Sequence, residues 1–197
     1  MKVPILILAA GASTRMMGRD KLLMQVGGRS LLRHVVQRAV ATGQQVMVAL
    51  PATDKVRQNA LAGLDVQFIP VANCTQGMAA SLRAGLAELP KDSDGLLVAL
   101  ADMPDIATED YHSLINAFRD GPDANIQRAS TADGTAGNPV LLPQWALNDP
   151  NIFQGDAGAR HLMRKHADKV RLVPLPNNHA TCDLDTPDDW ATWRAAP

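Results

Sequence analysis

Short apolar segments alternate along the chain with segments whose apolar residues recur every three or four positions. The first kind predicts buried strands and the second predicts amphipathic helices. We expect strands at residues 3–9, 45–50, 66–70, 95–100, 125–129 and 170–173, with a further short apolar run at 140–142. We expect helices at residues 30–42, 54–62, 77–86, 108–118 and 157–166, and a last helix after residue 186.

Residues that favour helix ends support several of these helices. Ser30 precedes the first helix and Gly43 follows it. Asp54 and Thr108 are placed to cap two of the later helices, and Thr186 is followed by a proline and two aspartates. Serine, threonine and aspartate side chains accept hydrogen bonds from the first N–H groups of a helix, and proline fits its first position.

The alternation favours an α/β fold with a mostly parallel mixed sheet and helices on both faces. It loosens between residues 121 and 150, where Asp133-Gly134 and Gly137-Asn138-Pro139 are turn signals. No internal repeat, low-complexity tract or linker divides the chain. We therefore expect a single domain over residues 1–197.

Composition excludes several function classes. The 197 residues are 46% hydrophobic and 20% charged, which is typical of a globular protein. With 19 basic and 20 acidic residues, no global basic field attracts nucleic acid, and 4% aromatic residues are too few for a base-stacking platform. The first apolar run is far shorter than the ~20 residues that span a bilayer. We expect a cytoplasmic protein without nucleic-acid or membrane partners, and its two cysteines do not indicate a disulfide framework.

The stretch after the first predicted strand carries the first candidate chemistry. The strand breaks at Ala9-Ala10-Gly11, and Arg15 and Lys21 follow closely. Small residues let the backbone approach a phosphate, which N–H groups and two cations can then hold. The stretch matches neither the Walker A motif nor the dinucleotide fingerprint. An ordinary strand-to-helix turn is the alternative interpretation.

Aspartates follow two other predicted elements. Asp102 comes directly after the strand at 95–100, and Asp183 and Asp185 lie two residues apart before the last helix. Magnesium prefers few carboxylates together with waters and phosphate oxygens, so Asp102 and one of the pair can form its site. The alternatives are a local turn hydrogen bond for Asp102 and helix-dipole compensation for the pair. With the small-residue loop and its cations, these aspartates indicate a nucleoside triphosphate with Mg²⁺, and hence phosphoryl or nucleotidyl transfer.

Six motifs in this order resemble the nucleotidyltransferases that mature the molybdenum cofactor. They are LAAGASTRM followed by Lys21, GMAASL at 77–82, ADMP at 101–104, GNP at 137–139, GDAGAR at 155–160 and DLDTPDD at 183–189. The resemblance implies a Rossmann-like nucleotidyltransferase fold. It also implies transfer of CMP from CTP to the molybdopterin form of the cofactor, release of pyrophosphate, and a molybdenum hydroxylase as recipient of the product.

The resemblance also implies site residues by position. The nucleotide-binding set is Leu8, Ala9, Ala10, Gly11, Ala12, Ser13, Arg15, Lys21, Gly77, Met78, Ser81 and Asp102. Among these, the catalytic set is Arg15, Lys21 and Asp102. The residues facing the second substrate are Asn138, Pro139, Asp156 and Arg160. The Mg²⁺ ligands are Asp102 and Asp185, with Asp183 as the other candidate.

Ala10 resembles the cytidylyl branch, because the guanylyl branch has a second glycine there. Its methyl group narrows the base pocket and favours a pyrimidine. Guanylyl transfer to the same cofactor, cytidylyl transfer to another small phosphate or alcohol, and a non-catalytic cofactor chaperone remain as alternatives. Met17 departs from the glycine of many relatives, which leaves the reach of Lys21 open.

Overall fold

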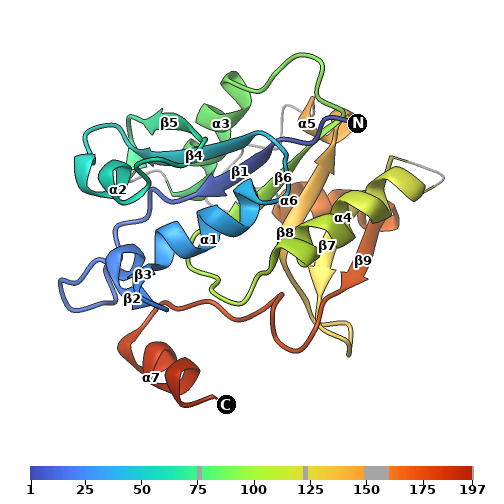
Figure 1. The fold of residues 1–197 in the computed structure, drawn as a ribbon. Coiled ribbons are helices and arrows are strands. Elements are labelled where there is room, and N and C mark those ends of the chain that lie inside the picture. Colours follow the sequence, from blue (N-terminus) through green and yellow to red (C-terminus); the bar gives the residue numbers. More distant parts are fainter. Residues whose placement is uncertain (75–76, 122–123, 149–159, 197) are drawn as a thin grey trace.

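A seven-stranded sheet lies at the centre of the described part of the chain, with helices on both faces (Figure 1). The computed structural model describes residues 1–74, 77–121, 124–148 and 160–196. The strands of this sheet are β1 (Ile5–Leu8), β4 (Val46–Pro51), β5 (Gln67–Val71), β6 (Gly95–Leu100), β7 (Ile126–Ser130), β8 (Ala136–Pro143) and β9 (Val170–Pro174). The α-helices are α1 (Leu31–Val40), α2 (Lys55–Ala60), α3 (Met78–Ala87), α4 (Thr108–Asp120), α5 (Gln144–Leu147), α6 (Arg160–Lys165) and α7 (Pro187–Ala195). The 3-10 helix η1 (Lys21–Leu23) and a small hairpin of β2 (Gln25–Val26) and β3 (Arg29–Ser30) precede α1.

The sheet is mixed and mostly parallel, which confirms the predicted fold class. Its strand order is β5-β4-β1-β6-β8-β7-β9. Only β8 runs against its neighbours β6 and β7 among the described strands of this sheet. β1 pairs in parallel with β4 on one side and with β6 on the other. The strand order therefore reverses at β1, which creates a crevice at the carboxyl ends of β1 and β6.

Successive residues of β1 pack on opposite faces of the sheet. Ile5 and Ile7 join a core that includes residues of α1 and α4, whereas Leu6 joins a second core with residues of α3. All three side chains are fully buried. A strand covered on both faces reads as a continuous apolar run, which is how β1 appears in the sequence. This double burial fixes the end of β1 and hence the start of the loop that follows it.

Three of the predicted helix caps are present and one prediction is wrong. Side-chain oxygens of Ser30, Asp54 and Thr186 accept hydrogen bonds from N–H groups in the first turns of α1, α2 and α7. At α4 the N-terminal N–H of Ala107 instead donates to the carboxylate of Asp110, at 2.8 Å. The Thr108 hydroxyl points elsewhere and donates to the carbonyl oxygen of Arg38, at 2.9 Å. The nearby aspartate thus replaces the threonine as the capping group.

The predicted turn at residues 137–139 is also wrong, because these residues lie inside β8. The pairing of β7 with β8 is irregular between Arg128 and Ser130. Asn138 directs its N–H out of that ladder to the carbonyl oxygen of Ala180, at 2.8 Å. A proline can stay in the strand at such an irregularity, since it lacks the N–H that a regular ladder needs. No helix in the described part of the chain is long and apolar enough to cross a membrane.

Candidate active site

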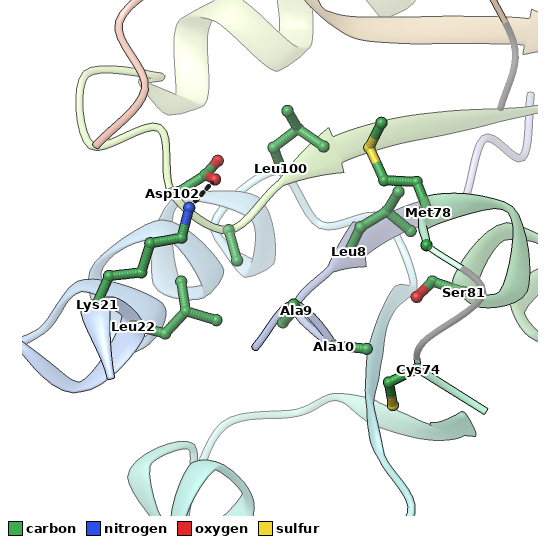
Figure 2. Close-up of a pocket in the computed structure, with 13 residues that line it drawn as sticks. Leu8, Ala9, Ala10, Lys21, Leu22, Cys74, Met78, Ser81, Leu100 and Asp102 are labelled. Atoms are coloured by element: carbon green, nitrogen blue, oxygen red, sulfur yellow. Dashed lines mark hydrogen bonds and ion pairs between the residues drawn. The ribbon is translucent and has the colours of Figure 1, made fainter. Parts of the chain in front are cut away.

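The carboxyl ends of β1 and β6 lie side by side, with Leu8 paired to Leu100. A cavity of about 230 Å³ lies between this edge and the start of α3 (Figure 2). The predicted residues that line it are Leu8, Ala9, Ala10, Gly11, Lys21, Gly77, Met78, Ser81 and Asp102. Its other lining residues are Leu22, Cys74, Leu100 and Ala101. Ala12, Ser13 and Arg15, which were also predicted, are not part of this lining.

The loop after β1 presents unpaired backbone donors. The N–H groups of residues 10–13 donate no hydrogen bond to any acceptor in the described part of the chain. The preceding N–H, that of Ala9, still pairs with the carbonyl oxygen of Ala49 at 2.9 Å. Ser13 closes the run in a left-handed conformation, with φ of 52°. Successive free N–H groups on small residues form a concavity suited to an anion such as a phosphate.

Lys21 connects the loop to the predicted metal ligands. Its Nζ lies 2.5 Å from Oδ2 of Asp102 and 2.7 Å from Oδ1 of Asp185. Nη2 of Arg15 lies 2.6 Å from Oδ2 of the same Asp185. Only 11% of the Lys21 side chain is exposed, so its two ion pairs are shielded from water, whereas 65% of the Arg15 side chain is exposed. The structure therefore joins two cations and two carboxylates that lie far apart in the sequence.

The charges of this network shift the pKa of its members. Burial alone would lower the pKa of Lys21, but the neighbouring Asp102 and Asp185 outweigh it and hold that pKa above its usual value. Burial would likewise raise the pKa of Asp185, but contacts with Lys21 and the charge of Arg15 lower it. Asp183 forms no ion pair with a cation in the described part of the chain. Burial, a hydrogen bond with Asp185 and repulsion from Asp102 raise its pKa.

One oxygen of the network is suited to a metal ion. Oδ1 of Asp102 is buried and has no hydrogen-bond partner in the described part of the chain. A buried carboxylate oxygen without a partner is costly unless a donor or a cation satisfies it. No group of three or more potential protein ligands is assembled among the described residues. Two carboxylates fit Mg²⁺, which completes its coordination with waters and phosphate oxygens.

The segment at residues 175–186, which we call the C-terminal strap, brings Asp185 to this site. The strap runs from β9 to α7 (Figure 1). It is fixed by the N–H of Leu184, which donates to the carbonyl oxygen of Asp102 at 3.0 Å. Nearer the start of the strap, Nδ1 of His179 lies 2.7 Å from Oδ2 of Asp110. Asp185, rather than Asp183, contacts both cations, which favours it as the metal ligand of the pair.

The first turn of α3 forms another wall of the cavity. Gly77 precedes α3 with φ of 69°, a left-handed conformation that suits glycine. Met78 and Ser81 lie on the side of α3 that borders the cavity (Figure 2). Ser81 is 4% exposed and lines the cavity, so its hydroxyl is shielded from bulk water. The helix N-terminus adds partial positive charge at the same place.

Two of the four residues predicted to face the second substrate, Asn138 and Pro139, do not line the cavity. Both lie in β8. Asp156 lies outside the described residues. Arg160 is the first residue of α6. Their predicted roles therefore stay predictions.

Arg57 and four lining residues of the cavity, Leu22, Cys74, Leu100 and Ala101, were not among the predicted site residues. Cys74 lines the cavity, although its segment carries no recognisable motif. Arg57 of α2 donates to the carbonyl oxygens of Ala9 and Gly11, at 2.6 and 2.9 Å. In the sequence, the short helix that contains Arg57 resembles an ordinary solvent-exposed helix. The only available signal was a cation one turn after the capping residue Asp54.

Comparison with known proteins gives a consistent result. A family model described as the MobA-like NTP transferase domain matches residues 5–170. A probable molybdenum cofactor guanylyltransferase from a Nostoc species is 28% identical over 193 residues, covering 94% of this chain and 87% of that protein. The bifunctional protein GlmU of Rhodococcus opacus is 31% identical over 130 residues, covering 62% of this chain. The matched part of this chain spans only about a quarter of the length of that relative, 26%.

Solved structures show the same fold. Rv0371c from Mycobacterium tuberculosis superimposes with a TM-score of 0.85 at 24% identity, covering 99% of this chain and 98% of that one. A complex of Rv0371c with manganese gives a TM-score of 0.82 at 22% identity and covers all of both chains. These likenesses show an α/β nucleotidyltransferase fold.

Proposed function

Because the chain belongs to the MobA-like NTP transferase family, we propose that it is a nucleotidyltransferase that moves CMP from CTP to molybdopterin. The observation that carries this proposal is the run of free N–H groups at residues 10–13, next to Lys21 and two carboxylates. Amide donors, cations and a metal-binding pair are what transfer of a nucleotide requires, since such catalysis rests on positioning and charge neutralisation.

The proposed reaction has one chemical step. An oxygen of the phosphate monoester on molybdopterin attacks the α-phosphorus of CTP and forms a new P–O bond. The bond from the α-phosphorus to the bridging oxygen breaks in line, and pyrophosphate leaves with the electron pair. No side chain acts as a nucleophile. A molybdenum hydroxylase would then receive the product.

The residues of the site have separate roles in this proposal. The loop N–H groups hold the phosphate oxygens, and Lys21 and Arg15 add positive charge beside them. Asp102 and Asp185 would hold Mg²⁺, which supplies charge neutralisation at the phosphates when bound. The partnerless Oδ1 of Asp102 supports this role. Because Lys21 contacts both carboxylates, it couples the metal ligands to the phosphate-binding loop.

The choice of CTP rests on Ala10. This residue is 6% exposed and lines the cavity. A methyl group at this point takes space that a glycine would leave for a purine. The second candidate function is guanylyl transfer to the same cofactor, which the Nostoc relative favours by its description.

Nucleotide binding separates these candidates before any turnover is measured. Thermal unfolding is followed with CTP, GTP, ATP or UTP, each with and without Mg²⁺. A ligand at ~100 times its Kd stabilises a protein by about 2.7 kcal/mol. We expect CTP with Mg²⁺ to give the largest shift in Tm. A larger shift with GTP would replace the cytidylyl proposal by the guanylyl one, and no shift with any nucleotide would reject both.

A further inference from the structure

Arg57 is a buried cation whose contacts all belong to the phosphate-binding loop or its supports. Its side chain is 5% exposed. Nη1 and Nη2 donate to the carbonyl oxygens of Ala9 and Gly11, at 2.6 and 2.9 Å. Nε donates to Oδ2 of Asp20 at 2.8 Å and lies 3.3 Å from Oδ2 of Asp54. Each of the three guanidinium nitrogens thus donates to a different partner.

These bonds set the direction of the loop N–H groups. In a trans peptide the carbonyl oxygen and the following N–H point to opposite sides. When Arg57 draws the carbonyls of Ala9 and Gly11 toward α2, the N–H groups of Ala10 and Ala12 must point away from α2. Ala10 and Gly11 line the cavity and Arg57 does not. The free N–H groups of Ala10 and Ala12 are therefore held away from α2 by Arg57, and Ala10 borders the cavity.

Asp20 connects Arg57 to Lys21 through hydrogen bonds. Oδ1 of Asp20 accepts hydrogen bonds from the N–H of Leu22, at 3.0 Å, and from the hydroxyl of Ser13, at 3.4 Å. Ser13 in turn accepts from the N–H of Lys21, at 3.3 Å. Arg57 therefore connects the beginning of the loop with the residue that carries its main cation.

A lysine could not make these contacts. All three N–H donors of a lysine are on one nitrogen atom, whereas the planar guanidinium spreads its donors over three nitrogens. The short helix α2 places Arg57 correctly because Asp54 caps it and accepts the N–H of Arg57, at 2.9 Å. The arrangement is thus specific to arginine at this position of α2.

We propose that Arg57 is a positioning residue for the triphosphate, which holds the loop amides and Lys21 in their binding orientation without touching the nucleotide. This inference rests on the proposed function, because it assigns the loop to a nucleotide. The competing explanation is that Arg57 only stabilises α2. The two explanations differ in whether a change at Arg57 lowers nucleotide affinity independently of the stability of the protein.

Arg33 provides a matched control. It is also an arginine that donates to two carbonyl oxygens, those of Ala60 and Ala62, both at 3.0 Å. Its contacts lie at the far end of α2, away from the loop. Arg33→Lys therefore weakens the attachment of α2 in a comparable way but leaves the loop carbonyls in place.

The experiment measures Kd for CTP and GTP with Mg²⁺ by calorimetry and Tm by thermal unfolding, for wild type, Arg57→Lys and Arg33→Lys. Loss of two charge-assisted hydrogen bonds that orient the loop is expected to weaken nucleotide binding about tenfold or more in Arg57→Lys. In Arg33→Lys, Kd is expected to stay within about twofold of wild type even where Tm falls. Unchanged Kd in Arg57→Lys, or equal losses in both variants, would overturn the inference.

Asp20→Asn keeps the test decisive if Arg57→Lys does not fold. The amide retains one oxygen but removes the charge that Arg57 contacts, and nucleotide affinity should fall several-fold. Where both variants fold, their double mutant should lose less affinity than the two single losses combined, since the residues act together. Additive losses, or normal affinity in Asp20→Asn, count against the inference. A wild-type protein that binds neither CTP nor GTP rejects the proposed function and the inference together, whereas normal wild-type binding with insensitive variants rejects the inference alone.

Discussion

Replacing Gly137 by alanine tests how the C-terminal strap positions Asp185. An added Cβ at Gly137 would lie 1.8 Å from the carbonyl oxygen of Ala180 in the strap. Real Cβ atoms essentially never approach other atoms closer than 3.0 Å, so the strap carbonyl must move by about 1.2 Å, the difference from 1.8 Å. The hydrogen bond from the N–H of Asn138 to the same carbonyl, 2.8 Å long, would be disturbed as well.

The expected magnitude follows from these contacts. Overpacking of this kind costs about 1–3 kcal/mol and the lost hydrogen bond about 1 kcal/mol. We therefore expect Gly137→Ala to lower the free energy of unfolding by about 2–4 kcal/mol. A shift near 1 Å that reaches Asp185 would reduce turnover on the order of 10²-fold, because metal and phosphate geometry tolerate little displacement.

The assay follows nucleotide transfer as a function of Mg²⁺ concentration, together with thermal unfolding. Gly95→Ala is the control, since its Cβ would lie 2.7 Å from the carbonyl oxygen of Leu142. Gly95 begins β6 at the end of the strand opposite to the site, so this variant should lose stability and keep its Mg²⁺ dependence. Normal turnover and normal Mg²⁺ dependence in folded Gly137→Ala would refute the reasoning, because the strap would then absorb the shift before Asp185.

Three further sets of substitutions have defined outcomes. Asp102→Asn and Asp185→Asn should each keep the fold and remove most Mg²⁺-dependent transfer, whereas Asp183→Asn should retain it; the reverse result in steady-state assays would exchange the roles of the two strap aspartates. Ala10→Gly should shift the ratio of kcat/KM for CTP over GTP toward GTP, and an unchanged ratio would show that the methyl group does not select the base. Met17, 86% exposed with φ of 51°, holds a left-handed conformation, so Met17→Gly should raise stability by about 1 kcal/mol in denaturant unfolding and Met17→Ala should not.

The sequence predicted those features that depend on local chemistry. The continuous apolar run of β1, the cap at Ser30 and the capping group at Thr186 can each be read within a few residues. The small-residue loop and Asp102 were also recognisable, because each directly follows a predicted strand. The structure brings them together since parallel strands β1 and β6 end at the same edge.

Features that depend on distant contacts could not be predicted. Arg57 reaches back 48 residues to the carbonyl of Ala9, and nothing near it in the sequence indicates that partner. The close approach of Gly137 to Ala180 likewise requires the folded strap. The failed cap at Thr108 shows the same limit locally, because Asp110 competed for the helix end and the hydroxyl found a partner on α1.

The most direct test of the central claim is transfer of the labelled α-phosphate of CTP or GTP to molybdopterin, with pyrophosphate release measured in parallel. With Mg²⁺, the label from CTP should appear in the cofactor in equal amount to the pyrophosphate released, and Asp102→Asn should remove most of both. Label from GTP should be incorporated far more slowly. Preferential incorporation from GTP would contradict the cytidylyl assignment, and the absence of any transferred label from either nucleotide would contradict nucleotidyl transfer to this cofactor.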